Sequence, residues 1–135
     1  MPRKLPVIDQ ETGFFWTSGA DGRLRIQHCD ACGYWQHPPL VRCHKCHSAQ
    51  LSPQPVSGRG RVASWTVNQQ VWQGEADSAF VFAAIELEEQ AELYVFSNLL
   101  CPPAEAAGGT AVEVVFEHQD DVWIPLFKPV GTNNA

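Results

Sequence analysis

Four of the five cysteines in this sequence form two pairs whose spacing is typical of a metal site. Cys29 and Cys32 make the first C-x2-C pair, and after ten intervening residues Cys43 and Cys46 make the second. Each C-x2-C turn presents two sulfurs to one tetrahedral ion, so the pairs predict a four-thiolate site for zinc, with iron as the alternative. Such a site has no open position for water or substrate, and we therefore expect the metal to be structural. Because residues 28–50 are too short to fold on their own apolar content, metal binding would supply their folding energy.

The other residues able to do chemistry are histidines and one further cysteine. Four histidines lie near the cysteine pairs: His28, His37, His44 and His47. One of them could replace a thiolate as a metal ligand. Because all four sulfurs are well spaced, we instead expect the histidines to be solvated or to lie outside the ligand shell. Cys101 stands alone before two prolines. To act as a nucleophile it would need a nearby base, and His118 is the only histidine in the C-terminal half of the sequence. The sequence has no G-x-S-x-G, P-loop, G-x-G-x-x-G or H-E-x-x-H motif. We therefore assign no catalytic residue.

The 135-residue chain has a formal net charge of −6, which is divided unequally along the sequence. Residues 1–61 carry eight basic and four acidic residues, a balance of +4, whereas residues 62–135 carry one basic and eleven acidic residues, a balance of −10. Single-stranded nucleic acids bind in positively charged grooves. The acidic half therefore argues against a nucleic-acid-binding module, which we keep as the alternative function.

The sequence also bears on where the protein works. No apolar run approaches the ~20 residues that span a bilayer, and the N-terminus lacks the apolar segment of a secretory signal. We therefore expect a cytoplasmic protein without a membrane partner. Thiols stay reduced in the cytoplasm, so clustered cysteines there indicate a metal site rather than disulfides.

Glycine, proline and apolar residues divide the chain into segments. Asp9 can cap a turn that carries Glu11, and we expect residues 9–27 to be helical with a break near Gly19 and Gly22. The sequence LSPQPVSGRG is typical of a connector. The segments are an N-terminal helical segment over 1–27, a zinc ribbon over 28–50, a connector over 51–60, a barrel over 61–130 and a tail over 131–135.

From Arg61 onward the apolar residues alternate, which is typical of β-strands. Residues 79–87 are almost wholly apolar and predict a strand covered on both faces. A longer crossing is expected over 101–109. Five strands in this space predict a small closed barrel of OB type, with an open antiparallel sandwich as the alternative. The three remaining strands are expected in residues 92–100, 112–117 and 122–124.

Aromatic residues of this half could stack on a nucleobase or an adenine ring, although we expect most of them to line the barrel core. Trp72 is the exception, because polar residues surround it in the sequence NQQVWQG. The aromatic residues concerned are Trp65, Trp72, Phe80, Phe82, Tyr94, Phe96 and Trp123.

An ordered series of short motifs runs through nearly the whole chain. L-x4-C-x2-C-G is followed by P-P, C-x2-C, V-S-G-x-G-x-V, S-W-T-V, I-E-L-x-E, V-E-V-V-F and P-x-F-x-P. This series resembles the rubredoxin-like zinc-ribbon/OB-fold proteins, long called a domain of unknown function, that accompany thiolase-superfamily enzymes. The resemblance implies a mainly β fold with an N-terminal helix, a rubredoxin-like zinc ribbon and a C-terminal five-stranded OB-fold barrel. One departure is His44, which stands where the family usually has proline and makes the second cysteine pair more polar.

Members of that family are small non-catalytic subunits of hetero-oligomers with thiolases, acyltransferases, hydroxymethylglutaryl-CoA synthase or lipid-transfer-protein-like aldolases. In some relatives the module is fused to a hydratase-like chain. The resemblance therefore implies an accessory or scaffold subunit of an acyl-CoA enzyme complex of lipid metabolism, which binds or shelters CoA or acyl-CoA. Phe14, Phe15 and Trp16 would form its docking face. The candidate CoA-binding residues are Arg59, Arg61 and Trp72, with Arg42 and Lys45 as further candidates for phosphate contacts.

Overall fold

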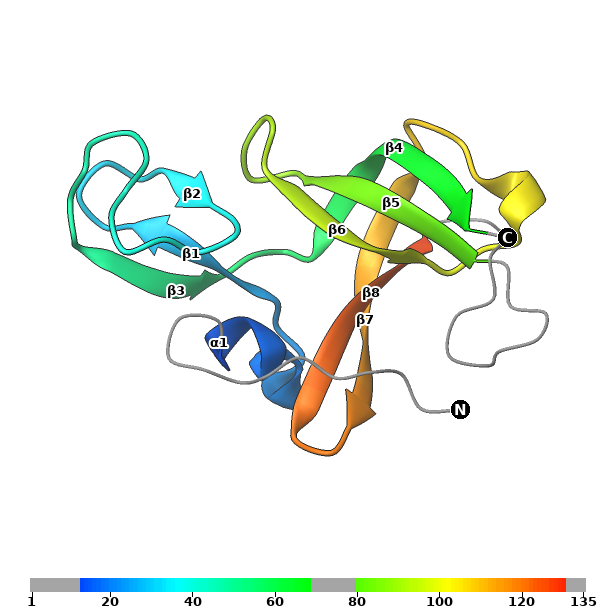
Figure 1. The fold of residues 1–135 in the computed structure, drawn as a ribbon, viewed down its shortest axis with the longest axis horizontal. Coiled ribbons are helices and arrows are strands. Elements are labelled where there is room, and N and C mark those ends of the chain that lie inside the picture. Colours follow the sequence, from blue (N-terminus) through cyan, green and yellow to red (C-terminus); the bar gives the residue numbers. More distant parts are fainter. Residues whose placement is uncertain (1–12, 69–79, 131–135) are drawn as a thin grey trace.

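The computed structural model describes residues 13–68 and 80–130, and β-strands dominate it (Figure 1). A small three-stranded sheet lies beside a closed five-stranded barrel, and a short helical segment packs below the sheet and against the barrel. The predicted combination of an N-terminal helix, a ribbon and a five-stranded barrel is therefore confirmed. No helix in the described ranges is long and apolar enough to cross a membrane.

The N-terminal segment is helical over a shorter stretch than the predicted residues 9–27, whose first residues lie outside the described ranges. A single α-helical turn, α1, spans Gly13–Trp16, and a 3-10 turn, η1, spans Ser18–Asp21. Gly22 then adopts a φ of 79°, a left-handed conformation in which glycine ends a helix without steric cost. The chain is already extended at Arg25, so the last part of the predicted helix is a strand.

Three strands form the ribbon sheet in the order β2-β1-β3, and both outer strands are antiparallel to the central one. They are β1 (Arg25–Cys29), β2 (Trp35–Gln36) and β3 (Leu51–Pro55). We expected residues 51–60 to connect the ribbon and the barrel, but their first half belongs to the ribbon sheet. Pro53 and Pro55 concealed this strand in the sequence. β3 tolerates them because it lies at the sheet edge, where an outward N–H group needs no strand partner.

The barrel closes in the order β4-β5-β6-β8-β7, as an OB fold does. All neighbours are antiparallel except β6 and β8, which meet in parallel at Leu99 and Phe127. The predicted longer crossing joins β6 to β7 and contains the 3-10 turn η2 (Pro103–Glu105). The strands are β4 (Arg59–Asn68), β5 (Phe80–Leu87), β6 (Tyr94–Leu99), β7 (Ala111–Gln119) and β8 (Val122–Pro129).

The ribbon and the barrel share one apolar core. Leu24 and Ile26 at the start of the ribbon lie in the same buried cluster as Leu87 and Leu93 of the barrel. Phe15 of α1 also belongs to this cluster, and its two aromatic neighbours pack against it. Of the aromatic trio that we expected to form a docking face, Phe15 therefore belongs to the interior, whereas Phe14 and Trp16 are only partly buried.

Large aromatic side chains also lie on the outside of the barrel. The prediction that both faces of residues 79–87 are covered is wrong at Phe82, which is 40% exposed. On the next strand Phe96 is 64% exposed, and Trp65 is also exposed rather than buried in the core. Alternate residues of β5 point inward and are buried, such as Val81, so Phe82 must point outward. The outward aromatic pair is therefore available for contact with another molecule.

Candidate metal centre and ribbon–barrel junction

The four paired cysteines converge on one point at the end of the ribbon. Their sulfur atoms all lie within 4.8 Å of one another, and Sγ–Sγ separations of 3.6 Å join Cys29 to Cys46 and Cys32 to Cys43. A tetrahedral ion with metal–sulfur bonds of ~2.3 Å requires sulfurs about 3.8 Å apart. The four thiols therefore fit a tetrahedral zinc ion.

Each cysteine pair is shaped by backbone hydrogen bonds of a tight turn. In the first pair the Gly33 N–H donates to the Cys29 carbonyl at 2.8 Å, and Gly33 adopts a φ of 84° that a side chain would disfavour. In the second pair the His47 N–H donates to the Cys43 carbonyl at 2.9 Å, and His47 also has a positive φ, 65°. The two loops are thus folded alike, and each directs its two sulfurs inward.

The second loop also favours the charged form of its first cysteine. Burial opposes a charge on Cys43, but the N–H groups of Cys46 and Lys45, together with the neighbouring thiols of Cys32 and Cys29, lower the pKa of the Cys43 thiol to about 6. A thiolate is the form that binds metal. Within the described ranges the potential metal-binding group contains these four cysteines and no histidine. The four-thiolate prediction is therefore preferred over a three-cysteine, one-histidine site.

The two arginines proposed as CoA contacts lie on β4 and are each about two-thirds exposed. Arg59 lies 3.8 Å from a carboxylate oxygen of Glu88, and Arg61 lies 3.0 Å from one of Glu86. The Glu92 N–H and the Arg61 guanidinium both donate to the Glu86 carboxylate and lower its pKa. Each guanidinium group therefore already has an acidic neighbour. A hollow of about 370 Å³ adjoins Arg61 and is lined by Gly60, Arg61, Glu86, Leu87, Glu88, Gln90 and Ala91.

The further phosphate candidates lie on the ribbon and have local contacts. Arg42 donates to the His47 carbonyl at 3.1 Å, and the Lys45 ammonium lies 5.6 Å from the centre of the Tyr34 ring. Trp72, the third candidate CoA contact, lies outside the described residues.

Cys101 and His118 are not brought together. Burial, and to a lesser degree Glu105, raises the pKa of the Cys101 thiol, which disfavours the reactive thiolate. Leu100, next to Cys101, donates its N–H to the Phe127 carbonyl, and Phe127 pairs with Val114 on β7. His118 lies four residues further along β7, about 13 Å from Val114 at ~3.3 Å per residue. The His118 ring stacks on Trp123, and its Nε2 lies 2.7 Å from the Asp120 carbonyl. These two residues therefore cannot act as a nucleophile and its base in this structure.

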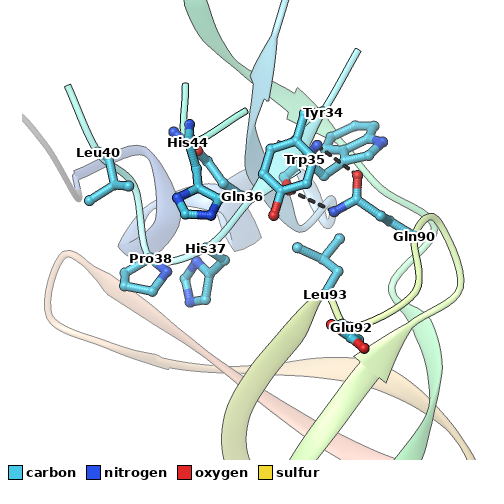
Figure 2. A pocket seen from close by; sticks show the side chains of 10 residues that line it. All are labelled: Tyr34, Trp35, Gln36, His37, Pro38, Leu40, His44, Gln90, Glu92 and Leu93. Atoms are coloured by element: carbon cyan, nitrogen blue, oxygen red, sulfur yellow. Dashed lines mark hydrogen bonds between the residues drawn. The ribbon is translucent and has the colours of Figure 1, made fainter. Parts of the chain in front are cut away.

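The turn between β5 and β6 fastens the barrel to the ribbon, and sequence reasoning missed this contact. The Gln90 amide donates to the Trp35 carbonyl at 2.8 Å, and the Trp35 N–H donates to the Gln90 amide oxygen at 3.0 Å (Figure 2). Gln90 thus bonds to the backbone of β2 much as a neighbouring strand would. Beside it, Glu89 accepts a hydrogen bond of 2.7 Å from the Ser57 N–H. The same turn therefore binds the ribbon through Gln90 and the connector before β4 through Glu89.

His37 occupies the middle of this junction. Burial lowers its pKa to about 4, and its Nδ1 is buried without a hydrogen-bond partner in the described structure. The imidazole stacks at a tilt on Phe15, with ring centres 4.7 Å apart. It lines the small pocket of about 180 Å³ shown in Figure 2, and also a larger groove of about 380 Å³ between α1, the ribbon and β6. The groove is lined by Phe15, Trp16, His37, Pro38, Pro39, Glu92, Tyr94 and Phe96.

Comparison with known families accounts for both halves of this architecture. Residues 16–52 match the family model described as "ChsH2, rubredoxin-like zinc ribbon domain", and residues 53–117 match "ChsH2, C-terminal OB-fold domain". The chain belongs to the ChsH2 zinc-ribbon/OB-fold family. The family resemblance inferred from the sequence motifs is therefore confirmed.

Curated relatives of this ChsH2-family chain are named as subunits of acyl-CoA enzymes. It is 28% identical to the "Probable enoyl-CoA hydratase alpha subunit" of Thermomonospora curvata, over 94% of this chain but 40% of that protein. It is 34% identical to the 3-oxo-4,17-pregnadiene-20-carboxyl-CoA hydratase alpha subunit of Mycobacterium tuberculosis, over 62% of this chain and 27% of that protein. The chain thus spans less than half the length of these two relatives. With the benzoylsuccinyl-CoA thiolase subunit BbsA of Thauera aromatica it shares 28% identity over 94% of both chains.

Solved structures support the same family fold. A chain of the "Ltp2-ChsH2(DUF35) aldolase" superposes with a TM-score of 0.83 and 27% identity, covering 94% of this chain and 100% of that one. A DUF35-family protein of unknown function from Sulfolobus solfataricus has a TM-score of 0.62 over 89% of this chain and 86% of that one. At 14% identity this second protein shows similarity of fold alone.

Proposed function

We propose that the protein is a non-catalytic accessory subunit that supports a thiolase, acyltransferase or aldolase acting on an acyl-CoA. The observation that carries this proposal is the near-complete match to BbsA, a protein named as a thiolase subunit, over 94% of both chains. The chain from the Ltp2-ChsH2 aldolase is covered over its full length, which points to the same kind of assembly. The two hydratase alpha subunits indicate that this module also occurs within longer acyl-CoA enzyme chains.

The site geometry favours a supporting role over a catalytic one. Four thiolates satisfy a tetrahedral zinc ion completely, so a metal bound there has no open position for substrate. The pKa of the only other thiol, Cys101, is raised, and His118 lies at the far end of β7. The zinc would therefore stabilise the ribbon while a partner subunit supplies the catalytic residues.

The experiment is an affinity purification of the tagged full-length chain from its native host, followed by mass spectrometry of the bound proteins. We expect a thiolase-like, aldolase-like or hydratase-like subunit to be recovered, and its acyl-CoA turnover to require the purified chain. Recovery of RNA without any acyl-CoA enzyme would contradict the proposal. So would turnover of an acyl-CoA by the chain alone, if Cys101→Ala abolished that activity.

The proposal also includes direct binding of CoA by this subunit. We place the phosphates near Arg59 and Arg61, whose exposed guanidinium groups would exchange an acidic neighbour for a phosphate. Charge-assisted hydrogen bonds contribute about 1.5–3 kcal/mol each, so Arg61→Ala should weaken CoA binding about tenfold or more. Isothermal titration of CoA into the full chain measures this, with Arg23→Ala on the exposed surface near η1 as control. Equal affinities for the two variants would exclude Arg61 from the CoA site.

A further inference from the structure

Two aromatic side chains form an exposed platform on the outer face of the barrel. Phe82 of β5 and Phe96 of β6 have ring centres 6.4 Å apart and planes within 13° of parallel, and both are exposed. The strand register explains why the two rings adjoin. Phe96 pairs with Ala84, and Ala84 lies two residues after Phe82 on the same face of β5, so Phe82 and Phe96 are diagonal neighbours. A monomeric barrel gains nothing from exposing this surface to water, and clustered exposed aromatic residues typically mark an interaction site.

The platform continues into the groove between α1, the ribbon and the barrel. Tyr94 and Phe96 line that groove from the barrel side, Trp16 lines it from α1, and Pro38 and Pro39 line it from the ribbon. We call the combined surface, formed by Phe82, Tyr94, Phe96 and this groove, the aromatic face. Its hollow of about 380 Å³ is large enough to receive bulky apolar side chains of another protein. A molecule seated there contacts all three parts of the fold at once.

The charges on the aromatic face indicate what kind of molecule fits it. Glu92 is the only charged residue that lines the groove within the described structure. Glu86, which lies on the same face of β5 as Phe82, is the cross-strand partner of Arg61 and forms an ion pair with it. Among the described residues, the lining of the groove thus offers no cation for a phosphate, a CoA or a nucleic acid. It is complementary to an apolar protein surface that places a lysine or arginine beside Glu92.

We propose that the aromatic face is the docking surface for the acyl-CoA enzyme subunit, whose docking patch carries an aromatic or aliphatic side chain and a nearby cation. This inference rests on the proposed function, because it takes the partner to be an acyl-CoA enzyme. Phe96 is the central contact, since it belongs both to the platform and to the groove. Binding energy at protein interfaces is concentrated in such central aromatic residues.

The test uses the partner subunit identified in the native-host purification, produced separately and titrated with the zinc-loaded full chain. Phe96→Glu and Phe96→Ala should each raise the dissociation constant at least tenfold. Val41→Glu is the matched control, because Val41 is 74% exposed on the ribbon and does not line the groove. It should leave the dissociation constant within twofold. Glu92→Lys should weaken binding several-fold, and added salt should reduce this difference.

Metal content and circular dichroism of each variant show whether it is folded, and exposure of Phe96 makes loss of folding unexpected. If wild type and both Phe96 variants bind the partner equally, the docking surface is wrong while the accessory function stands. If no acyl-CoA enzyme binds the wild type, the proposed function itself fails. Sedimentation of the free chain adds a third outcome. A wild-type dimer that Phe96→Glu dissociates would assign the face to a second copy of this chain and overturn the proposal.

Discussion

The contact between Gln90 and the ribbon leads to a quantitative prediction about stability. Gln90→Ala removes both hydrogen bonds to the Trp35 backbone, at 2.8 and 3.0 Å, in a partly buried place. A hydrogen bond of this kind contributes about 1 kcal/mol net, so the free energy of unfolding should fall by about 2 kcal/mol. This is a substantial part of the ~5–15 kcal/mol by which a typical domain is stable.

The measurement is urea unfolding of the zinc-loaded protein, followed by tryptophan fluorescence and far-UV circular dichroism. Coincidence of the two curves tests whether the ribbon and the barrel unfold together, as their shared core predicts. Gln50→Ala is the matched control, because Gln50 is an exposed glutamine on the ribbon. It should change the free energy of unfolding by no more than about 0.5 kcal/mol.

Gln90→Glu separates the hydrogen bonds from the packing of the side chain. Glutamate has the size of glutamine but presents an oxygen to the Trp35 carbonyl where the Gln90 amide donated. We expect it to destabilise the protein at least as much as alanine does. If Gln90→Ala and Gln90→Glu both unfold like Gln50→Ala, the Gln90 contact does not hold the ribbon, and the reasoning is refuted.

Three further predictions concern the metal, pH and backbone packing. Cys43→Ser removes a buried ligand and should abolish stoichiometric metal binding, measured by elemental analysis, together with the ordered ribbon signal in circular dichroism. Burial lowers the pKa of His37 from 6.5 to about 4, so its contribution to stability is complete above pH 6.5 and declines as pH falls toward 4. Urea unfolding should show a loss of about 1 kcal/mol between pH 7.5 and 5.5 that His37→Gln lacks. Gly60→Ala places a Cβ against the Glu86 carbonyl oxygen and should lower stability by about 2 kcal/mol in thermal unfolding, whereas Ala63→Ser on the exposed part of the same strand should not.

Features set by local sequence could be predicted well. The metal site depends on two short turns whose spacing is visible in the sequence, so Cys29 and Cys46 could be placed together without knowing the fold. Alternating apolar residues, and one continuous apolar run over residues 79–87, indicated the five barrel strands, since each barrel strand must bury at least one side. The strand β3 escaped this approach, because its prolines are compatible only with an edge position that the sequence does not reveal.

Features that depend on distant contacts could not be predicted in this way. Gln90 and Trp35 are 55 residues apart, and nothing in either local sequence indicates that they meet. The exposure of Phe82 has a similar origin. When both faces of a strand carry apolar residues, the sequence pattern cannot show which face is exposed to solvent. The length of the N-terminal helix was overestimated because Leu24 and Ile26 suit a helix face as well as they suit the core that they enter.

The positions of these residues connect the metal centre to the aromatic face through very few elements. Cys29 ends β1, β1 pairs with β2, and β2 is held at Trp35 by Gln90. Gln90 lies in the turn that leads into β6, the strand that carries Phe96. The groove is lined by Pro38 and Pro39 of the ribbon and by Tyr94 and Phe96 of β6. A metal bound by the four cysteines would therefore act on this surface, because it would fix the ribbon that supplies His37, Pro38 and Pro39 to the groove.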